Sequence, residues 1–148
     1  MQNVFGSAES IMKSGTMFQA MGDGRLGFID VRDIADVATA VLLDRAWDRG
    51  IYELTGPASL SFHDVARELS GALGRDVKYV PITPDQLRET IVKMGWGEWG
   101  ADVMADYSAA YAKGWGDFTT TFVEKISGHP ARSFAQFARE VLAPALTR

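Results

Sequence analysis

The stretch that decides the fold is Arg25-Leu-Gly-Phe-Ile-Asp-Val-Arg-Asp-Ile-Ala-Asp-Val-Ala-Thr-Ala-Val-Leu-Leu43. Its first part, residues 26–31, has the apolar run of a short strand. Asp33 then stands where a helix N-cap is expected, and the apolar residues after it follow helical spacing. The stretch therefore predicts a strand that turns directly into a helix, as in α/β folds.

The same alternation continues on the C-terminal side. Residues 51–55 and 77–82 have the composition of two further strands. Helices are expected over residues 61–73, 83–94, 101–113, 121–126 and 133–142, the last limited by Pro144. Capping boxes are expected for the pairs Ser61 and Asp64, Thr83 and Gln86, Thr121 and Glu124, and Ser133 and Gln136.

Helices separate the expected strands, and this order favours parallel pairing because parallel neighbours need a crossover. The prediction is an α/β fold tending towards α+β. It has a short, partly parallel sheet of about three strands and about five to six helices, a truncated remnant of a Rossmann-like architecture.

Composition narrows the class of protein. The 148 residues fit a single domain over 1–148, and 47% hydrophobic residues can build a core. A net charge of −4, without a Lys/Arg run, argues against nucleic-acid binding. The absence of cysteine excludes disulfides and thiol chemistry. We find no apolar run long enough for a membrane span and no signal-peptide pattern, so a cytoplasmic protein is expected.

Two glycine patterns match the letters of a dinucleotide-binding fingerprint, Gly22-Asp-Gly24-Arg-Leu-Gly27 and Gly95-Trp-Gly97-Glu-Trp-Gly100. The mechanism needs a strand before the glycines and a helix N-terminus after them. The first pattern leads into a strand and the second follows a helix. Both are therefore interpreted as turns, and no cofactor-binding residue is assigned.

Residues with catalytic or metal-binding chemistry are sparse. His63 and His129 stand alone, without the neighbouring ligands that a metal site requires. Tyr107 is followed by Tyr111, not by a lysine four residues later. Asp30, Arg32 and Asp33 are interpreted as a helix cap with a local ion pair. No catalytic residue and no metal ligand is predicted.

Aromatic residues gather in the second half of the chain, where Trp96, Trp99, Tyr107 and Tyr111 follow one another closely. Tryptophans flanked by glycine in a loop are hard to explain by core packing alone. They could line a pocket for an apolar or aromatic ligand, cover a partner surface, or cap a small core. All four are candidate pocket residues.

Several segments together resemble the NmrA-like proteins, which are atypical short-chain dehydrogenase/reductase proteins. Besides residues 22–38, the segments that carry the resemblance are Tyr52-Glu-Leu-Thr-Gly-Pro57, Leu60-Ser-Phe-His-Asp-Val-Ala66, Leu73-Gly-Arg-Asp-Val-Lys-Tyr79 and Gly128-His-Pro-Ala-Arg-Ser-Phe-Ala-Gln-Phe137. The resemblance covers nearly the whole chain but only the C-terminal half of that family. The glycine-rich turn of the family's nucleotide-binding half has no counterpart here.

The resemblance implies a modified Rossmann protein that binds NADP or NAD. Some members reduce quinones or carbonyl compounds, and others are regulators. It also implies that Asn3, Phe5 and Phe28 face a substrate pocket. Because the phosphate-binding turn is missing, we expect the isolated chain to bind no NAD(P) and to be inactive alone.

Three functions remain open at this point. The first is a small-molecule-binding module for an apolar or aromatic ligand. The second is an oxidoreductase that needs a separate Rossmann half, and the third is a regulatory or protein-interaction module. The resemblance places residues 51–55 on a sheet built mainly by the missing half. An open strand edge is therefore expected, covered by a second copy in a homodimer or by the N-terminal segment.

Overall fold

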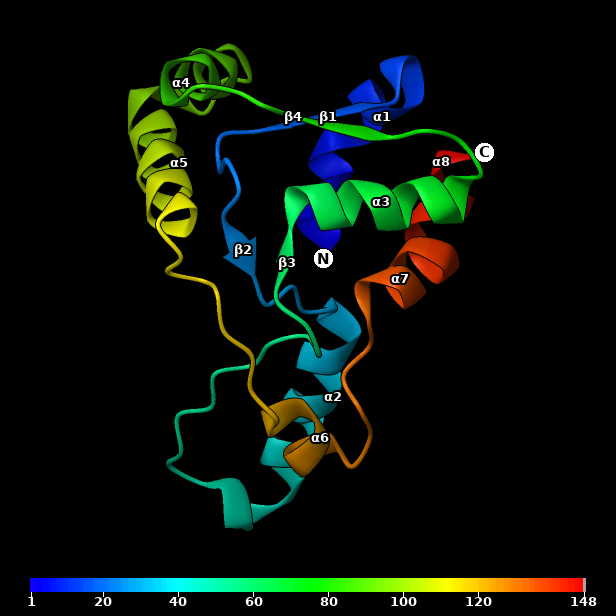
Figure 1. The fold of residues 1–148 in the computed structure, drawn as a ribbon. Helices are drawn as coiled ribbons and strands as arrows, with labels where there is room; N and C mark the ends of the chain where they lie inside the picture. The colour runs from blue at the N-terminus through cyan, green and yellow to red at the C-terminus, as the bar shows by residue number, and fades with distance from the viewer. Residues whose placement is uncertain (148) are drawn as a thin grey trace.

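The computed structural model describes residues 1–147. In Figure 1 the larger part of the molecule gathers around α3 and the two strands above it, while α2 and α6 form a smaller part below. The helices are α1 (Ala8–Ser14), α2 (Val31–Leu43), α3 (Phe62–Leu73), α4 (Pro84–Lys93), α5 (Gly97–Ala112), α6 (Phe122–Ser127), α7 (Phe134–Phe137) and α8 (Ala143–Leu146). Short 3₁₀ helices span Gln2–Ser7 and Arg45–Trp47, and a π-helical turn spans Ala138–Leu142.

The strands form two short ladders, and the α/β fold class is confirmed. β1 (Thr16–Gln19) and β4 (Lys78–Pro81) pair in parallel. β2 (Arg25–Leu26) and β3 (Leu60–Ser61) pair antiparallel. The parallel pairing was expected for the strand over 77–82, whereas its partner β1 was not.

Two expected strands are corrected. The strand over 26–31 ends at Leu26, and residues 51–55 form no strand. Both segments have strand-like sequences, but a strand also needs a neighbour that accepts and donates its backbone hydrogen bonds. Within residues 1–147 no segment pairs with residues 51–55.

The start of α2 is also corrected. Asp30, not Asp33, is the N-cap, and its side chain accepts a hydrogen bond from the backbone N–H of Arg32. The helix therefore begins at Val31, and Asp33 lies buried in the first turn. This placement leaves the carboxylate of Asp33 free to bind a distant segment.

The capping boxes at Ser61 and Thr83 are confirmed, with both reciprocal hydrogen bonds formed. Ser133 makes the cap bond alone. The box predicted at Thr121 is wrong, because no side-chain cap bond forms there.

Two helix boundaries in the C-terminal third are corrected as well. α5 begins at Gly97 rather than at residue 101. Pro144 does not end the last helix but stands in the first turn of α8, where a missing N–H is tolerated.

The main core lies between α3, the β1–β4 pair and the C-terminal helices. Its fully buried members are Ile11, Met17, Val65, Leu69, Phe137, Ala138 and Leu142. A smaller cluster joins α2 to α6 through Val37, Val123 and Ile126. Among the described residues, no helix is both long and apolar enough to cross a membrane.

Candidate functional site

Phe28 and Phe5, two of the expected pocket residues, lie on the main core. The Phe28 ring packs edge-on against Phe62 and Phe134, with centroid distances of 5.5 and 5.8 Å. The Phe5 ring lies 6.3 Å from that of Phe137. Because Phe134 and Phe137 are also in contact, one continuous aromatic row links the two.

A small hollow opens beside Phe28, with a volume of about 100 Å³. Its lining is mostly apolar and consists of Phe28, Pro57, Ala58, Leu60, Glu68, Ser133, Phe134 and Ala135. Pockets for drug-sized ligands measure about 300–1,000 Å³. This hollow is therefore too small to enclose an aromatic ligand.

A second aromatic group lies at the C-terminal end of α5. The ring centroids of Tyr107 and Tyr111 are 6.2 Å apart with nearly parallel planes, and Trp115 lies 5.3 Å from Tyr111. Tyr107 and Trp115 are exposed, and Tyr111 is half-buried. We call Tyr107, Tyr111 and Trp115 the α5 aromatic patch.

Two glycines set the position of the patch. A Cβ on Gly116 would lie 2.6 Å from the Tyr111 ring, and a Cβ on Gly24 would lie 2.4 Å from the Tyr111 carbonyl oxygen. Only glycine lets the chain approach Tyr111 this closely from both sides. The first glycine pattern of the sequence thus serves the packing of α5, as its interpretation as a turn allows.

Arg25 helps to hold the segment that follows Trp115 against strands β2 and β3. Its guanidinium donates to the Ser59 carbonyl at 2.6 Å and pairs with Asp64 at 3.1 Å. The Ser59 hydroxyl in turn donates to Asp117 at 2.6 Å, and Gly27 N–H donates to the Gly116 carbonyl at 3.2 Å. These bonds hold the turn that carries Trp115 against β2.

Trp96 and Trp99 lie at the other end of α5. Trp96 is the N-cap residue of α5, and Trp99, in the first turn of the helix, is 79% exposed. At 1.5 Å per residue, the twelve positions from Trp99 to Tyr111 span about 18 Å. The structure therefore separates these tryptophans from the tyrosines that were predicted with them.

Asn3 is exposed on the N-terminal 3₁₀ helix, next to a residue that the sequence did not single out. Gln2 donates to the Asp30 carboxylate at 3.0 Å, and its amide oxygen accepts from Val31 N–H at 3.1 Å. The side chain of Gln2 thus fastens the N-terminal helix to the start of α2. No periodicity could reveal this contact, because the two segments are far apart in sequence.

The ion pair predicted at the start of α2 is confirmed, with Asp30 rather than Asp33 as the cap. Arg32 pairs with the buried Asp30 at 2.7 Å. Burial alone would raise the pKa of Asp30, but hydrogen bonds from Arg32 and Gln2 outweigh it and lower that pKa to about 2. Asp30 is therefore a structural carboxylate that stays ionised near neutral pH.

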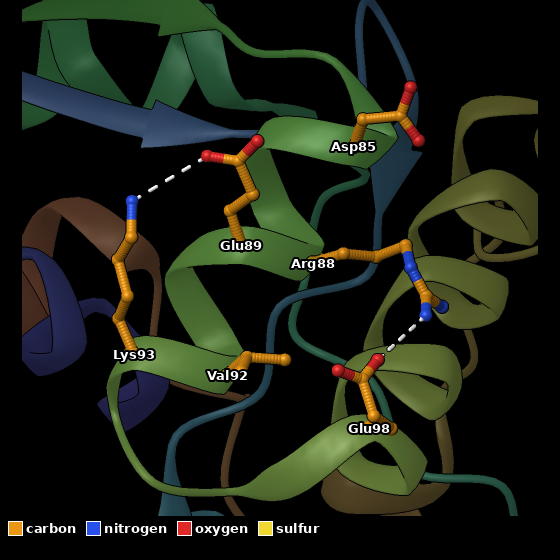
Figure 2. A pocket seen from close by; sticks show the side chains of 6 residues that line it. All are labelled: Asp85, Arg88, Glu89, Val92, Lys93 and Glu98. Carbon is orange, nitrogen blue, oxygen red and sulfur yellow. Dashed lines mark hydrogen bonds and ion pairs between the residues drawn. The ribbon is translucent and has the colours of Figure 1, made fainter.

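A groove between α4 and α5 holds about 400 Å³ and is open to solvent. Figure 2 shows that both cations of its lining are paired, Lys93 with Glu89 at 3.5 Å and Arg88 with Glu98 at 3.1 Å. Arg88 also pairs with Asp102. These cations are satisfied by carboxylates, so the groove is a salt-bridged helix contact rather than an anion site.

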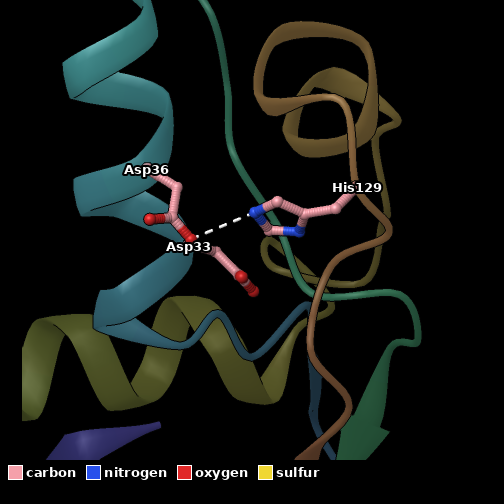
Figure 3. A group of neighbouring side chains, drawn as sticks. All are labelled: Asp33, Asp36 and His129. Atoms are coloured by element: carbon pink, nitrogen blue, oxygen red, sulfur yellow. Dashed lines mark hydrogen bonds and ion pairs between the residues drawn. The ribbon is translucent and has the colours of Figure 1, made fainter.

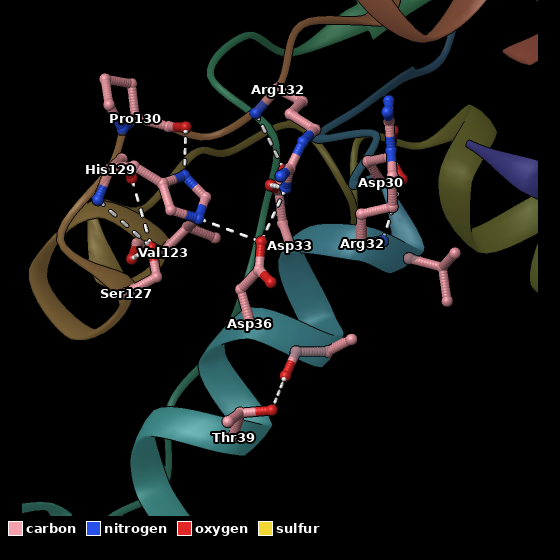
Figure 4. Close-up of polar contacts among 12 residues, drawn as sticks. Asp30, Arg32, Asp33, Asp36, Thr39, Val123, Ser127, His129, Pro130 and Arg132 are labelled. Atoms are coloured by element: carbon pink, nitrogen blue, oxygen red, sulfur yellow. Dashed lines mark hydrogen bonds and ion pairs between the residues drawn. The ribbon is translucent and has the colours of Figure 1, made fainter. Parts of the chain in front are cut away.

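A cluster of Asp33, Asp36 and His129 brings together residue types that bind metals (Figure 3). Figure 4 shows that Arg132 already occupies the position a cation would take. Its guanidinium contacts Asp33 and lies 2.9 Å from Asp36, and its backbone N–H donates to Asp33 at 2.8 Å. The cluster therefore joins α2 to the segment before α7.

His129 completes this cluster with both ring nitrogens facing acceptors. Nδ1 lies 3.0 Å from the Pro130 carbonyl oxygen and Nε2 lies 3.0 Å from the Asp36 carboxylate. The Pro130 carbonyl, with Asp36, raises the pKa of His129. The hydrogen bond from Arg132, helped by His129, lowers the pKa of Asp36.

Comparison with known proteins adds relatives of known chemistry, although no family model matches the chain. It is 38% identical over 139 residues to an NAD(P)H azoreductase of Xenophilus azovorans, covering 94% of this chain and 49% of the azoreductase. It is 34% identical over 129 residues to an uncharacterized oxidoreductase of Bacillus subtilis (strain 168), covering 87% and 45% respectively.

Among solved structures, an NADPH-dependent quinone oxidoreductase of Escherichia coli superimposes with a TM-score of 0.83 at 24% identity, covering 95% of this chain and 51% of that protein. The same oxidoreductase complexed with NADPH gives a TM-score of 0.79. This likeness confirms the fold. The chain spans about half the length of each of these three relatives, two of which are NAD(P)H-dependent oxidoreductases by name.

Proposed function

Because this chain corresponds to the C-terminal half of an NmrA-like protein, we propose that it supplies the substrate side of an NAD(P)H-dependent oxidoreductase. A separate nucleotide-binding half would hold the dinucleotide. The observation that carries the proposal is the 38% identity to half of an azoreductase. This favours the oxidoreductase over a binding module that has no reaction of its own.

The substrate class follows from the α5 aromatic patch. Two of its three rings, Tyr107 and Trp115, are exposed, and flat aromatic molecules stack on such rings. Close backbone contacts hold the third, Tyr111, in place. The hollow beside Phe28 is too small for such a ligand. The proposed substrate is therefore a planar aromatic acceptor that lies on Tyr107, Tyr111 and Trp115.

The residues of this chain do not fit the pyrophosphate of a dinucleotide. The first glycine pattern packs on Tyr111 and leads into β2. The second opens α5 with Glu98 in its first turn, and a carboxylate there repels phosphate. The proposal therefore places the dinucleotide on the other half, and no step of the reaction is assigned to residues of this chain.

Binding of an azo dye to the isolated chain tests the substrate side. We expect methyl orange to bind in equilibrium dialysis, and Tyr107→Ala to weaken binding by up to about tenfold through the loss of one stacked ring. Trp99→Ala, at the far end of α5, serves as the matched control and should leave the affinity unchanged. Equal binding by the wild-type chain and Tyr107→Ala would contradict a substrate site on the patch.

A further inference from the structure

Four apolar or aromatic residues of α5 recur at every fourth position and form one row along the helix. They are Trp99, Val103, Tyr107 and Tyr111, and Trp115 follows at the same spacing beyond the end of the helix. Residues four positions apart are neighbours on a helix surface, with Cβ atoms about 5–6 Å apart. We call Trp99, Val103, Tyr107 and Tyr111 the α5 row.

The row is open to solvent. Trp99 and Tyr107 are exposed, and Val103 between them is half-buried. Trp96 is exposed as well, and a Cβ on Gly100 would lie 3.9 Å from its ring, so the indole lies beside the first turn of α5. An apolar surface therefore continues from the α5 aromatic patch towards α4, over about 12 Å from Tyr107 to Trp99.

The acidic residues of α5 lie on a different face of the helix. Glu98, Asp102 and Asp106 form a parallel row one position earlier, which is about 100° around the helix. Arg88 of α4 pairs with the first two of them, lying 3.1 Å from Glu98. Ala101, on the other flank, is buried. The α5 row is thus an uncharged strip one side chain wide.

We propose that the α5 row binds an apolar chain carried by the aromatic acceptor, an inference that rests on the proposed function. The flat head of the acceptor lies on the α5 aromatic patch, and its chain runs past Tyr107 and Val103 to Trp99. The row is continuous with the patch, so one ligand can cover both. Because the row carries no charge, it favours an apolar chain over a polar substituent.

A protein partner fits this strip poorly. α5 has 16 residues and is therefore about 24 Å long. Even at the full width of a helix, about 10 Å, the strip offers roughly 240 Å². A stable protein interface buries about 800 Å² on each partner. A thin chain needs no such area, because each methylene group that it buries contributes separately.

Two azo dyes with the same head test the proposal by equilibrium dialysis with the isolated chain. One is methyl orange, and the other carries a decyl chain in place of one N-methyl group and is used below the concentration at which it forms micelles. We expect the wild-type chain to bind the decyl dye at least about tenfold more tightly than methyl orange.

Trp99→Ala separates the chain from the head. It should weaken binding of the decyl dye by about three- to tenfold and leave binding of methyl orange unchanged. Val103→Asp places a charge in the middle of the row and should weaken the decyl dye more than methyl orange. Equal affinity of the wild type and Trp99→Ala for the decyl dye would overturn the proposal.

Leu42→Ala is the matched control, because Leu42 is an exposed apolar residue on another helix, α2. It should leave the affinity for both dyes unchanged. A loss of decyl-dye affinity as large as that in Trp99→Ala would mean that the decyl chain binds exposed apolar residues without selection, and would overturn the proposal.

Three further outcomes separate this proposal from its alternatives. Binding to phosphatidylcholine vesicles that is lost in Trp99→Ala would make the row a membrane-contact surface, and a dimer in light scattering that Trp99→Ala dissociates would mean that a second copy covers it. Either result would overturn the proposal. Methyl orange binding that does not depend on Tyr107, with a decyl gain that still depends on Trp99, would support the row while contradicting the proposed substrate site.

Discussion

Arg132 and Asp33 lie 99 residues apart and meet through both backbone and side chain. The Arg132 N–H donates to Asp33 at 2.8 Å, and the guanidinium contacts the other carboxylate oxygen. The side chain of Asp33 is fully buried. The first turn of α2 is thereby fixed to the segment before α7, between the smaller and the larger part of the molecule.

Removing Arg132 should destabilise the protein strongly. Arg132→Leu keeps the backbone N–H bond to Asp33 but leaves its buried carboxylate without a positive partner, and the free energy of unfolding should fall by about 3–5 kcal/mol. Urea unfolding measures this. Arg67→Leu is the control, because Arg67 is largely exposed in its pair with Asp64 and its loss should cost about 1 kcal/mol or less. Similar losses for both variants would contradict a buried tie at Asp33.

Lowering the pH should reduce the stability of the protein as Asp30 becomes protonated. Its pKa is lowered to about 2 from an unfolded value of 3.8, so its stabilisation is present above pH 3.8 and is lost as the pH falls towards 2. The contribution is of order 2 kcal/mol. Stability measured by urea unfolding from pH 5 to 2 should fall less steeply in Asp30→Asn than in the wild type. The same slope in both proteins would contradict this role of Asp30.

His129 should make stability depend on pH in the opposite direction. Its pKa is raised by the Pro130 carbonyl and Asp36, against the nearby charge of Arg132. The stabilisation is therefore complete below the unfolded pKa of 6.5 and is lost as the pH rises through the higher folded value. His129→Gln should flatten this part of the pH profile of urea unfolding, and a wild-type profile that rises with pH here would contradict the assignment.

Two threonines precede helices, but only one of them caps its helix through its side chain, and this difference gives a prediction. Thr83 accepts the cap bond from Gln86 N–H at 3.2 Å, so Thr83→Ala should cost about 1 kcal/mol in thermal or urea unfolding. Thr121 makes no side-chain cap bond, and Thr121→Ala should cost much less. A larger loss at Thr121 than at Thr83 would show that the cap geometry is wrong.

Local signals in the sequence predicted local structure well. The caps at Ser61 and Thr83 depend on residues within a few positions of one another. The strand predicted near residues 78–81 also formed, because β1 supplies its distant partner. Residues 51–55 failed as a strand for the opposite reason, since strand pairing depends on a distant neighbour. Asp33 was mistaken for a cap because its partner, Arg132, is remote in sequence.

In the candidate site, too, the sequence showed what depends on nearby residues and missed what depends on the fold. The aromatic density of the C-terminal part was visible in the sequence, but Trp115 joins Tyr111 only through the turn that Gly116 permits. Trp96 and Trp99 were grouped with these residues by sequence proximity. The length of α5 separates them, because a helix carries its two ends apart.

Reduction of methyl orange by NADPH tests the central claim most directly. A chimera, in which this chain replaces the matched half of the Xenophilus azovorans azoreductase, and the isolated chain are assayed side by side by the loss of dye absorbance. We predict that the chimera reduces the dye, that Tyr107→Ala in the chimera raises KM, and that the isolated chain is inactive. A folded chimera that binds NADPH but leaves the dye intact would contradict the claim that this chain provides the substrate side of an oxidoreductase.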